Sequence, residues 1–197
     1  MGKIAVTTLW DLTQLVKEEM CINTIESYVS SQFVGYNYNV YKTKKDEVLQ
    51  IFNDEECITV VGGSSWDKLE WRSNFNVRPL WSDLIHEGYY HSALEVTENN
   101  NFIERDKMLF DGLSRGGAIA SVICFLNRQW QGVGFGSPKP FKRGVNVDFV
   151  NYRNILDPIT KLIPSFVPCG EIRNKCFLRR AHTGYGEHIG SEEFVEW

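Results

Sequence analysis

The spacing of apolar side chains changes several times along this chain, and each spacing predicts a different element. Near the N-terminus, Leu9, Leu12, Leu15 and Val16 recur at three- and four-residue intervals, which is the period of a helix with one buried face. The same period continues over residues 25–29. Two short helices are therefore expected to open the fold.

The rest of the chain alternates between short apolar runs, which predict strands, and longer apolar stretches, which predict helices. The expected strands are residues 36–41, 48–52, 57–61, 107–111, 131–136 and 146–153, and the expected helices are residues 85–96 and 117–126. This alternation predicts an α/β fold with a mostly parallel central sheet flanked by helices, in which ligands bind beyond the carboxyl ends of the strands. No internal repeat or linker interrupts the pattern, so we expect a single domain over residues 1–197.

The composition is that of a folded domain with a weakly acidic balance. Hydrophobic residues make up 43% and aromatic residues 13% of the 197 residues, which is enough for a sizeable core. The formal net charge is −4 and the sequence pI is near 5.6. The chain therefore offers no basic field for phosphate backbones, and nucleic acid is not an expected partner.

The N-terminal segment and the cysteines bear on the compartment. The first apolar stretch is broken at Asp11, so it fits neither a secretory leader nor a membrane span. The five cysteines form an odd set without a CxxC pair, which favours reduced thiols and a cytoplasmic protein over a disulfide framework. No histidine and carboxylate cluster has the spacing of a metal site, so neither a metal nor another cofactor is expected.

The segment DGLSRGGAIA, residues 111–120, follows an apolar run and contains the first candidate for chemistry. Gly112, Ser114 and Gly116 form the glycine–x–serine–x–glycine pattern, in which small flanking residues let a sharp strand-to-helix turn expose a serine hydroxyl. We therefore predict that Ser114 is a nucleophile. The competing interpretation is a small residue in a glycine-rich helix start or phosphate cradle, but the lysine that such cradles need after the glycines is missing.

Residues with complementary chemistry stand near the ends of the other predicted strands. The amides of Arg115 and Ser64 are the expected oxyanion-hole donors, because one follows the nucleophile and the other lies in a loop after an earlier strand. Asp157 is the expected orienting acid. The general base must then be His182 or His188, which completes the chain order serine, aspartate, histidine.

Five segments resemble, in the same order, the motifs of the fungal-type class 3 lipases of the α/β-hydrolase fold. They are ITVVGGSSWDKLEW, LIHEGYYHSALEV, GLSRGGAIA, GFGSPKPFKRG and YRNILDPITKLIP, and they lie within residues 57–164. They are similar to the family's oxyanion strand, helix start, Gly-His-Ser-Leu-Gly-Gly elbow, Phe-Gly-x-Pro strand end and Asn-x-x-Asp loop. The resemblance implies an α/β-hydrolase-like fold and a serine hydrolase that cleaves acylglycerols, phospholipid acyl bonds or short acyl esters without a cofactor.

The resemblance also bears on which histidine is the base. His188 is preferred, because compact members of the family place the base just before a last helix, and Ser191 has the chemistry to cap such a helix. His182 is the alternative, since Ala181-His182-Thr183-Gly184-Tyr185 resembles the Ala-His-x-x-Tyr stretch of larger members.

The chain departs from the family pattern at three positions near the nucleophile. Gly62 replaces an arginine of the oxyanion strand, Leu113 replaces a histidine and Arg115 replaces a leucine. None of these changes removes a catalytic atom, and the cation of Arg115 is expected to favour a polar or anionic acyl substrate. The segment that corresponds to the lid is short, and its Trp66 and Trp71 are expected as core or lid aromatics that could line an acyl pocket.

Other functions remain compatible with the same residues. A hydrolase scaffold without activity would serve as a binding or regulatory module, and an amidase or thioesterase would use the same triad on another acyl bond. The expected partner is a small-molecule ester or lipid substrate, with no membrane span and at most transient contact with a lipid surface. The oligomeric state is left open.

Overall fold

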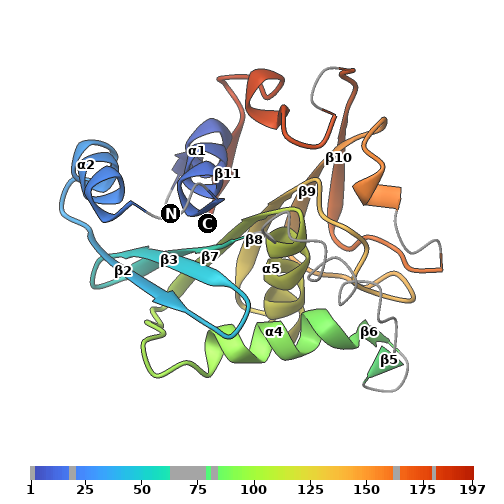
Figure 1. Ribbon diagram of the computed structural model, residues 1–197, viewed down its shortest axis with the longest axis horizontal. Coiled ribbons are helices and arrows are strands. Elements are labelled where there is room, and N and C mark those ends of the chain that lie inside the picture. Colours follow the sequence, from blue (N-terminus) through green and yellow to red (C-terminus); the bar gives the residue numbers. More distant parts are fainter. Residues whose placement is uncertain (1–2, 18–20, 63–78, 81–83, 162–164, 179–180) are drawn as a thin grey trace.

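A computed structural model describes residues 3–17, 21–62, 79–80, 84–161, 165–178 and 181–197. The strands of its main sheet are β2 (Asn37–Lys42), β3 (Glu47–Phe52), β4 (Glu56–Val61), β7 (Lys107–Leu113), β8 (Gln131–Phe135), β9 (Phe149–Asn154) and β10 (Glu171–Lys175). Among the described residues these form one seven-stranded sheet in the order β10-β9-β8-β7-β4-β3-β2 (Figure 1). Neighbouring strands from β10 to β4 are parallel, and only β3 and β2 add antiparallel pairs.

The central strand β7 explains why the sheet is buried on both faces. It lies between β4 and β8, with Asp111 opposite Val60 on one side and Val133 on the other. Because successive side chains of a strand point to opposite faces, Leu109 belongs to one apolar core and Phe110 to the other. A strand that is apolar on both faces needs helices on both sides of the sheet.

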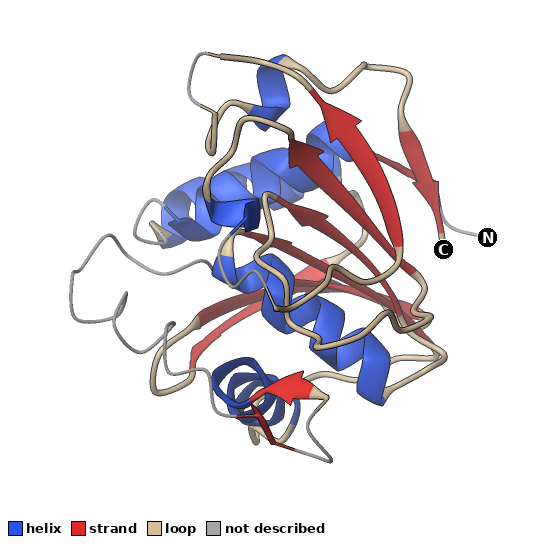
Figure 2. Ribbon diagram, turned by 90° about the vertical axis from the view of Figure 1, so that its right-hand side faces the viewer, coloured by secondary structure: helices blue, strands red, loops and turns tan. Residues whose placement is uncertain are grey.

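The helices supply these two layers. Helix α1 (Val6–Lys17) packs on β3, β4 and β7, and α2 (Ile22–Gln32) adds to the same core. On the other face, α5 (Arg115–Leu126) packs on β7 and β8, and α4 (Glu87–Thr97) packs on α5. Figure 2 shows helices on both sides of the twisted strands.

The two chain ends meet in a small second sheet. Strand β1 (Lys3–Ala5) pairs antiparallel with β11 (Phe194–Glu196), so that Lys3 lies opposite Glu196. The ends of the chain are accordingly neighbours in both views (Figures 1 and 2).

The structure confirms the α/β class, with a mostly parallel sheet flanked by helices, and differs in local details. The helix expected over residues 85–96 begins at Glu87, because Ile85–His86 forms strand β6 with β5 (Pro79–Leu80). His86 then caps α4, since its Nδ1 accepts a hydrogen bond from the Gly88 amide at 3.1 Å. Strand β10 was not expected. None of the described helices combines the length and the apolar character that crossing a membrane requires.

Candidate active site

Ser114 lies on a strained turn between β7 and α5. Its φ of 55° makes it the only non-glycine residue with a positive φ in the described chain, a conformation that costs about 1–3 kcal/mol and persists only where the surroundings enforce it. The Ser114 amide donates to the Phe135 carbonyl at 2.8 Å, and its own carbonyl accepts from the Ala118 amide at 3.2 Å. Such a turn lifts a half-buried serine hydroxyl above the carboxyl end of the sheet.

The elbow also lies against the end of β4. A Cβ atom on Gly116 would stand 2.1 Å from the Val61 carbonyl oxygen and 2.9 Å from that of Gly62. Only glycine permits this approach. The first turn of α5 is therefore packed directly on the strand that leads into the predicted oxyanion loop.

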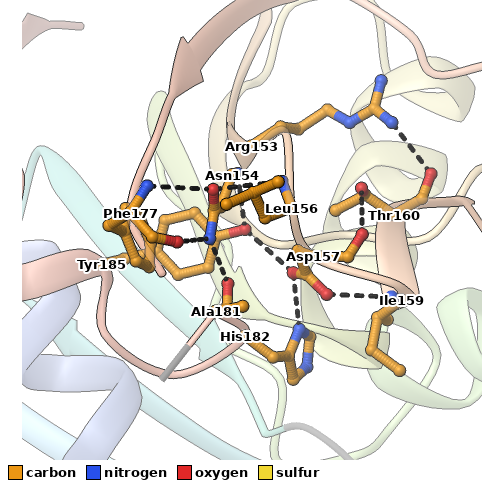
Figure 3. A network of polar contacts seen from close by, with 10 residues as sticks. All are labelled: Arg153, Asn154, Leu156, Asp157, Ile159, Thr160, Phe177, Ala181, His182 and Tyr185. Carbon is orange, nitrogen blue, oxygen red and sulfur yellow. Dashed lines mark hydrogen bonds and ion pairs between the residues drawn. The ribbon is translucent and has the colours of Figure 1, made fainter. Parts of the chain in front are cut away.

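Asp157 lies just beyond the carboxyl end of β9 and is fully buried. Its Oδ1 accepts from the Ile159 amide at 2.8 Å, which opens the short 3-10 helix Ile159–Lys161. Its Oδ2 contacts His182 Nδ1 at 2.7 Å (Figure 3). Because an ionised carboxylate can only accept, Nδ1 donates to it and Nε2 is left with a free lone pair.

Tyr185 is a second donor to the same carboxylate. Its hydroxyl donates to Asp157 Oδ2 at 3.0 Å and accepts from the Asn154 amide at 2.9 Å. Burial, followed by the nearby Asp157 charge, raises the pKa of Tyr185. The phenol therefore stays protonated and remains a donor.

Asn154 holds the segment that leads to His182. Its side-chain amide donates to the Phe177 carbonyl at 2.7 Å and to the Ala181 carbonyl at 3.0 Å, and its Oδ1 accepts from the Phe177 amide at 3.2 Å. Figure 3 shows this carboxamide between β9 and the C-terminal segment. The strand that carries Asp157 at its end therefore also fixes the approach of the histidine.

Gly136 connects the His182–Asp157 pair to the serine. Its φ is 59°, and a Cβ there would lie 2.9 Å from Asp157 Oδ2 and 3.1 Å from His182 Nδ1. The preceding residue is the one whose carbonyl binds the Ser114 amide. The end of β8 thus brings the serine, the histidine and the aspartate to one place. Among the described residues the Ser114 hydroxyl makes no hydrogen bond, and contacts between nucleophile and base are often long before substrate binds.

The expectation that His188 lies beside Asp157 is wrong, and the alternative His182 takes that place. His188 is exposed and stacks on Phe177, with ring centroids 4.3 Å apart and planes 12° apart. His188 was expected to precede a C-terminal helix. This helix does not form, because residues 194–196 pair with β1 as strand β11. The histidine of the Ala-His-x-x-Tyr stretch is therefore the one that lies beside Asp157.

Arg115 combines an amide at the first position of α5 with a side chain that is not available to substrate. The residue is 7% exposed, and its guanidinium forms an ion pair with Asp46 and donates from Nη2 to Ser92 Oγ at 2.6 Å. Burial lowers the pKa of Arg115 to about 10, so it remains charged at neutral pH. The expectation that this cation meets a polar or anionic acyl substrate is therefore wrong.

Three predicted site residues cannot be compared with these contacts. Ser64, Trp66 and Trp71 lie outside the described residues. In the part of the chain that is described, no three histidine, cysteine, aspartate or glutamate side chains gather where they could hold a metal ion.

Comparisons with known proteins agree with this architecture. No protein-family model and no curated protein matches the sequence. Among solved structures, lipase II from Rhizopus niveus is similar with a TM-score of 0.60 and 10% identity, over 88% of this chain and 83% of that one. The Rhizomucor miehei lipase in complex with its propeptide has a TM-score of 0.57 and 15% identity, over 88% and 70%. A mutant of MDLA from Penicillium cyclopium has a TM-score of 0.54 and 13% identity, over 90% and 78%. At these identities the likeness shows a lipase-like α/β-hydrolase fold.

Proposed function

We propose that this protein is a serine hydrolase of carboxylic esters, related to the class 3 lipases. The observation that carries the proposal is the 2.7 Å contact between His182 Nδ1 and buried Asp157 Oδ2, next to the strand end that binds the strained Ser114. The five motif segments and the lipase-like fold support the same conclusion. The proposed substrates are acylglycerols, phospholipid acyl bonds or short acyl esters.

In the first half of the reaction, His182 Nε2 would take the proton of the Ser114 hydroxyl while Oγ attacks the ester carbonyl carbon. The carbonyl oxygen becomes an oxyanion, which the Arg115 amide and a second amide at Ser64 would stabilise. When the intermediate collapses, the C–O bond to the alcohol breaks, the alcohol leaves with the proton from His182, and an acyl-serine remains.

In the second half, His182 would deprotonate a water molecule that attacks the acyl-serine. Collapse of this second intermediate releases the carboxylic acid and returns the proton to Ser114. Asp157 keeps the imidazole in the tautomer with a free Nε2 and stabilises the imidazolium that forms in each half. Trp66 and Trp71 are proposed to line the acyl pocket.

The free cysteines bear on where the enzyme would act. All five are free thiols, and Cys57, Cys124 and Cys169 are buried. We propose a reducing compartment, the cytoplasm, because nothing in the fold depends on a disulfide.

The test combines turnover and active-site labelling. Wild type should hydrolyse p-nitrophenyl butyrate and react with a fluorophosphonate, and both should be lost in Ser114→Ala and fall by several orders of magnitude in His182→Ala. His188→Ala is the matched control and should stay active, because its imidazole stacks on Phe177 away from Asp157. A folded wild type without labelling or turnover would instead favour a binding scaffold. Labelling without ester turnover would favour an amidase or thioesterase.

A further inference from the structure

The side chain of Arg115 joins three segments that are far apart in the sequence. Arg115 is the first residue of α5, Asp46 ends the turn between β2 and β3, and Ser92 lies in the middle of α4. All three residues are buried, with exposures of 7%, 2% and 3%. The guanidinium therefore contacts Asp46 and Ser92 in the interior of the protein, next to the turn that carries Ser114.

The turn that carries Asp46 is itself fixed. The Asp46 amide donates to Thr43 Oγ1 at 2.9 Å, and its carbonyl accepts from the Thr43 amide at 2.8 Å. The next carbonyl in the chain, that of Glu47, accepts from the Gly62 amide at 2.8 Å. Two consecutive residues of the β2–β3 hairpin therefore bind both sides of the site. Asp46 pairs with the Arg115 guanidinium, and Glu47 binds Gly62, which precedes the predicted oxyanion loop.

The elbow and Gly62 also touch directly, which closes the arrangement. The backbone at Gly116 packs on the carbonyls of Val61 and Gly62 so tightly that a Cβ would not fit. A rigid contact on one side and an ion pair on the other fix the elbow relative to β4. Strained backbone such as that of Ser114 persists where neighbouring contacts enforce it in this way.

Two departures from the class 3 lipase motifs meet at this point. The motif places an arginine where this chain has Gly62 and a leucine where it has Arg115. A buried ion pair is a weak source of stability, because apolar residues of similar volume often serve as well. The hydrogen bond from Nη2 to Ser92, in contrast, is directional, and together with the ion pair it fixes where the Arg115 side chain leaves the backbone.

We propose that the Arg115 side chain is a positioning residue for the oxyanion hole: contacts with Asp46 and Ser92 hold the Arg115 amide in a fixed position relative to Ser114 and the end of β4. This inference rests on the proposed ester hydrolysis. Arg115 acts here through its own backbone and through β4, and its guanidinium touches no substrate. Its loss should therefore weaken binding of the transition state more than binding of the ester.

The main test uses the double variant Arg115→Leu/Asp46→Leu, which removes the pair without leaving a lone buried charge. With p-nitrophenyl butyrate, kcat should fall about 10- to 100-fold while KM changes less than about 3-fold, because only the alignment of the oxyanion donors is lost. Affinity for an alkylboronic acid, which forms a tetrahedral adduct on serine, should fall by the same factor as kcat. The thermal midpoint should remain close to that of wild type.

Two further variants keep the test decisive. Ser92→Ala removes only the hydrogen bond to Nη2 and should lower kcat in the same direction but less, which is measurable even where the double variant does not fold. Lys42→Gln is the control, because it removes an exposed ion pair with Glu47 in the same hairpin and should leave kcat unchanged.

The outcomes separate the two proposals. A folded double variant with wild-type kcat and wild-type boronate affinity, alongside an active wild type, overturns the role of Arg115 alone. An equal fall in kcat for Lys42→Gln would also overturn it, since any loosening of the hairpin would then suffice. A wild type that neither turns over nor labels overturns the proposed hydrolase and the role of Arg115 with it.

Discussion

At the scale of single residues, Asp157 Oδ2 accepts hydrogen bonds from both His182 Nδ1 and the Tyr185 hydroxyl. Tyr185→Phe would remove one of these two donors and leave the other. We expect kcat for ester hydrolysis to fall about 10-fold, since the carboxylate that orients His182 loses one hydrogen bond to a charged group. KM should change much less than kcat, because Tyr185 acts through Asp157 and is not expected to touch the ester.

Tyr41→Phe is the matched control for this change. The Tyr41 hydroxyl is also buried, and it donates to the Val96 carbonyl at 3.0 Å on the other face of the sheet. Tyr41→Phe loses one hydrogen bond and should lower the free energy of unfolding by about 1 kcal/mol. Tyr185→Phe also leaves the Asn154 amide without its acceptor and should lower it somewhat more. A fall in kcat in both variants, or in neither, would contradict the role assigned to Tyr185.

At the scale of secondary-structure elements, the contact between α5 and β4 allows no added atom at Gly116. Gly116→Ala places a methyl group 2.1 Å from the Val61 carbonyl oxygen, so helix and strand must separate. The free energy of unfolding in urea should fall by about 1–3 kcal/mol, the usual cost of overpacking. Ester turnover should fall with it, because the same contact positions the elbow.

Gly144→Ala provides the comparison. A Cβ at Gly144 meets nothing within 4 Å, so the same chemical change should alter the free energy of unfolding by less than about 0.5 kcal/mol. Equal losses at both positions would mean that backbone freedom, and not the close packing of α5 on β4, sets the cost.

The same scale explains which elements could be predicted from the sequence. Buried strands such as β4 and β7 can be predicted from their continuous apolar runs. Their alternation with helices along the chain predicts the parallel sheet. Strand β10 has the sequence EIRNK and lies at the sheet edge, where no side chain is fully buried, so it carries no apolar signal. Strand β11 forms by pairing with β1, at the opposite end of the chain, and local capping chemistry at Ser191 suggested a helix instead.

At the scale of the whole molecule, the partners of the candidate site residues depend on contacts between distant segments, which the local sequence does not show. Ser114 and Asp157 each follow a predicted strand of the parallel sheet, so their proximity could be predicted from the sequence. The choice between His182 and His188 depends on Asn154, which binds the chain at Phe177 and Ala181 and so directs the first of the two histidines to Asp157. The burial of the Arg115 guanidinium likewise depends on Asp46 in the β2–β3 turn, which precedes Arg115 by about seventy residues.

The stability of the whole molecule should also depend on pH through Asp111 in the central strand. This carboxyl is fully buried, and burial raises its pKa well above the usual range. The folded state therefore keeps a proton that the unfolded chain loses above about pH 4. Because the unfolded state then binds fewer protons, the free energy of unfolding should decrease as pH rises from about 4 toward the pKa of the folded state, by at most about 1.4 kcal/mol per pH unit.

Asp111→Asn isolates this contribution, since the amide has nearly the same shape and does not ionise. Urea unfolding of both proteins between pH 4 and pH 8 gives a difference in stability that should grow in favour of the variant as pH rises. Subtracting the two curves cancels the other titrating groups, which both proteins share. A difference that stays constant over this range would mean that Asp111 has the same proton occupancy in the folded and unfolded states, and that burial in β7 does not hold it neutral.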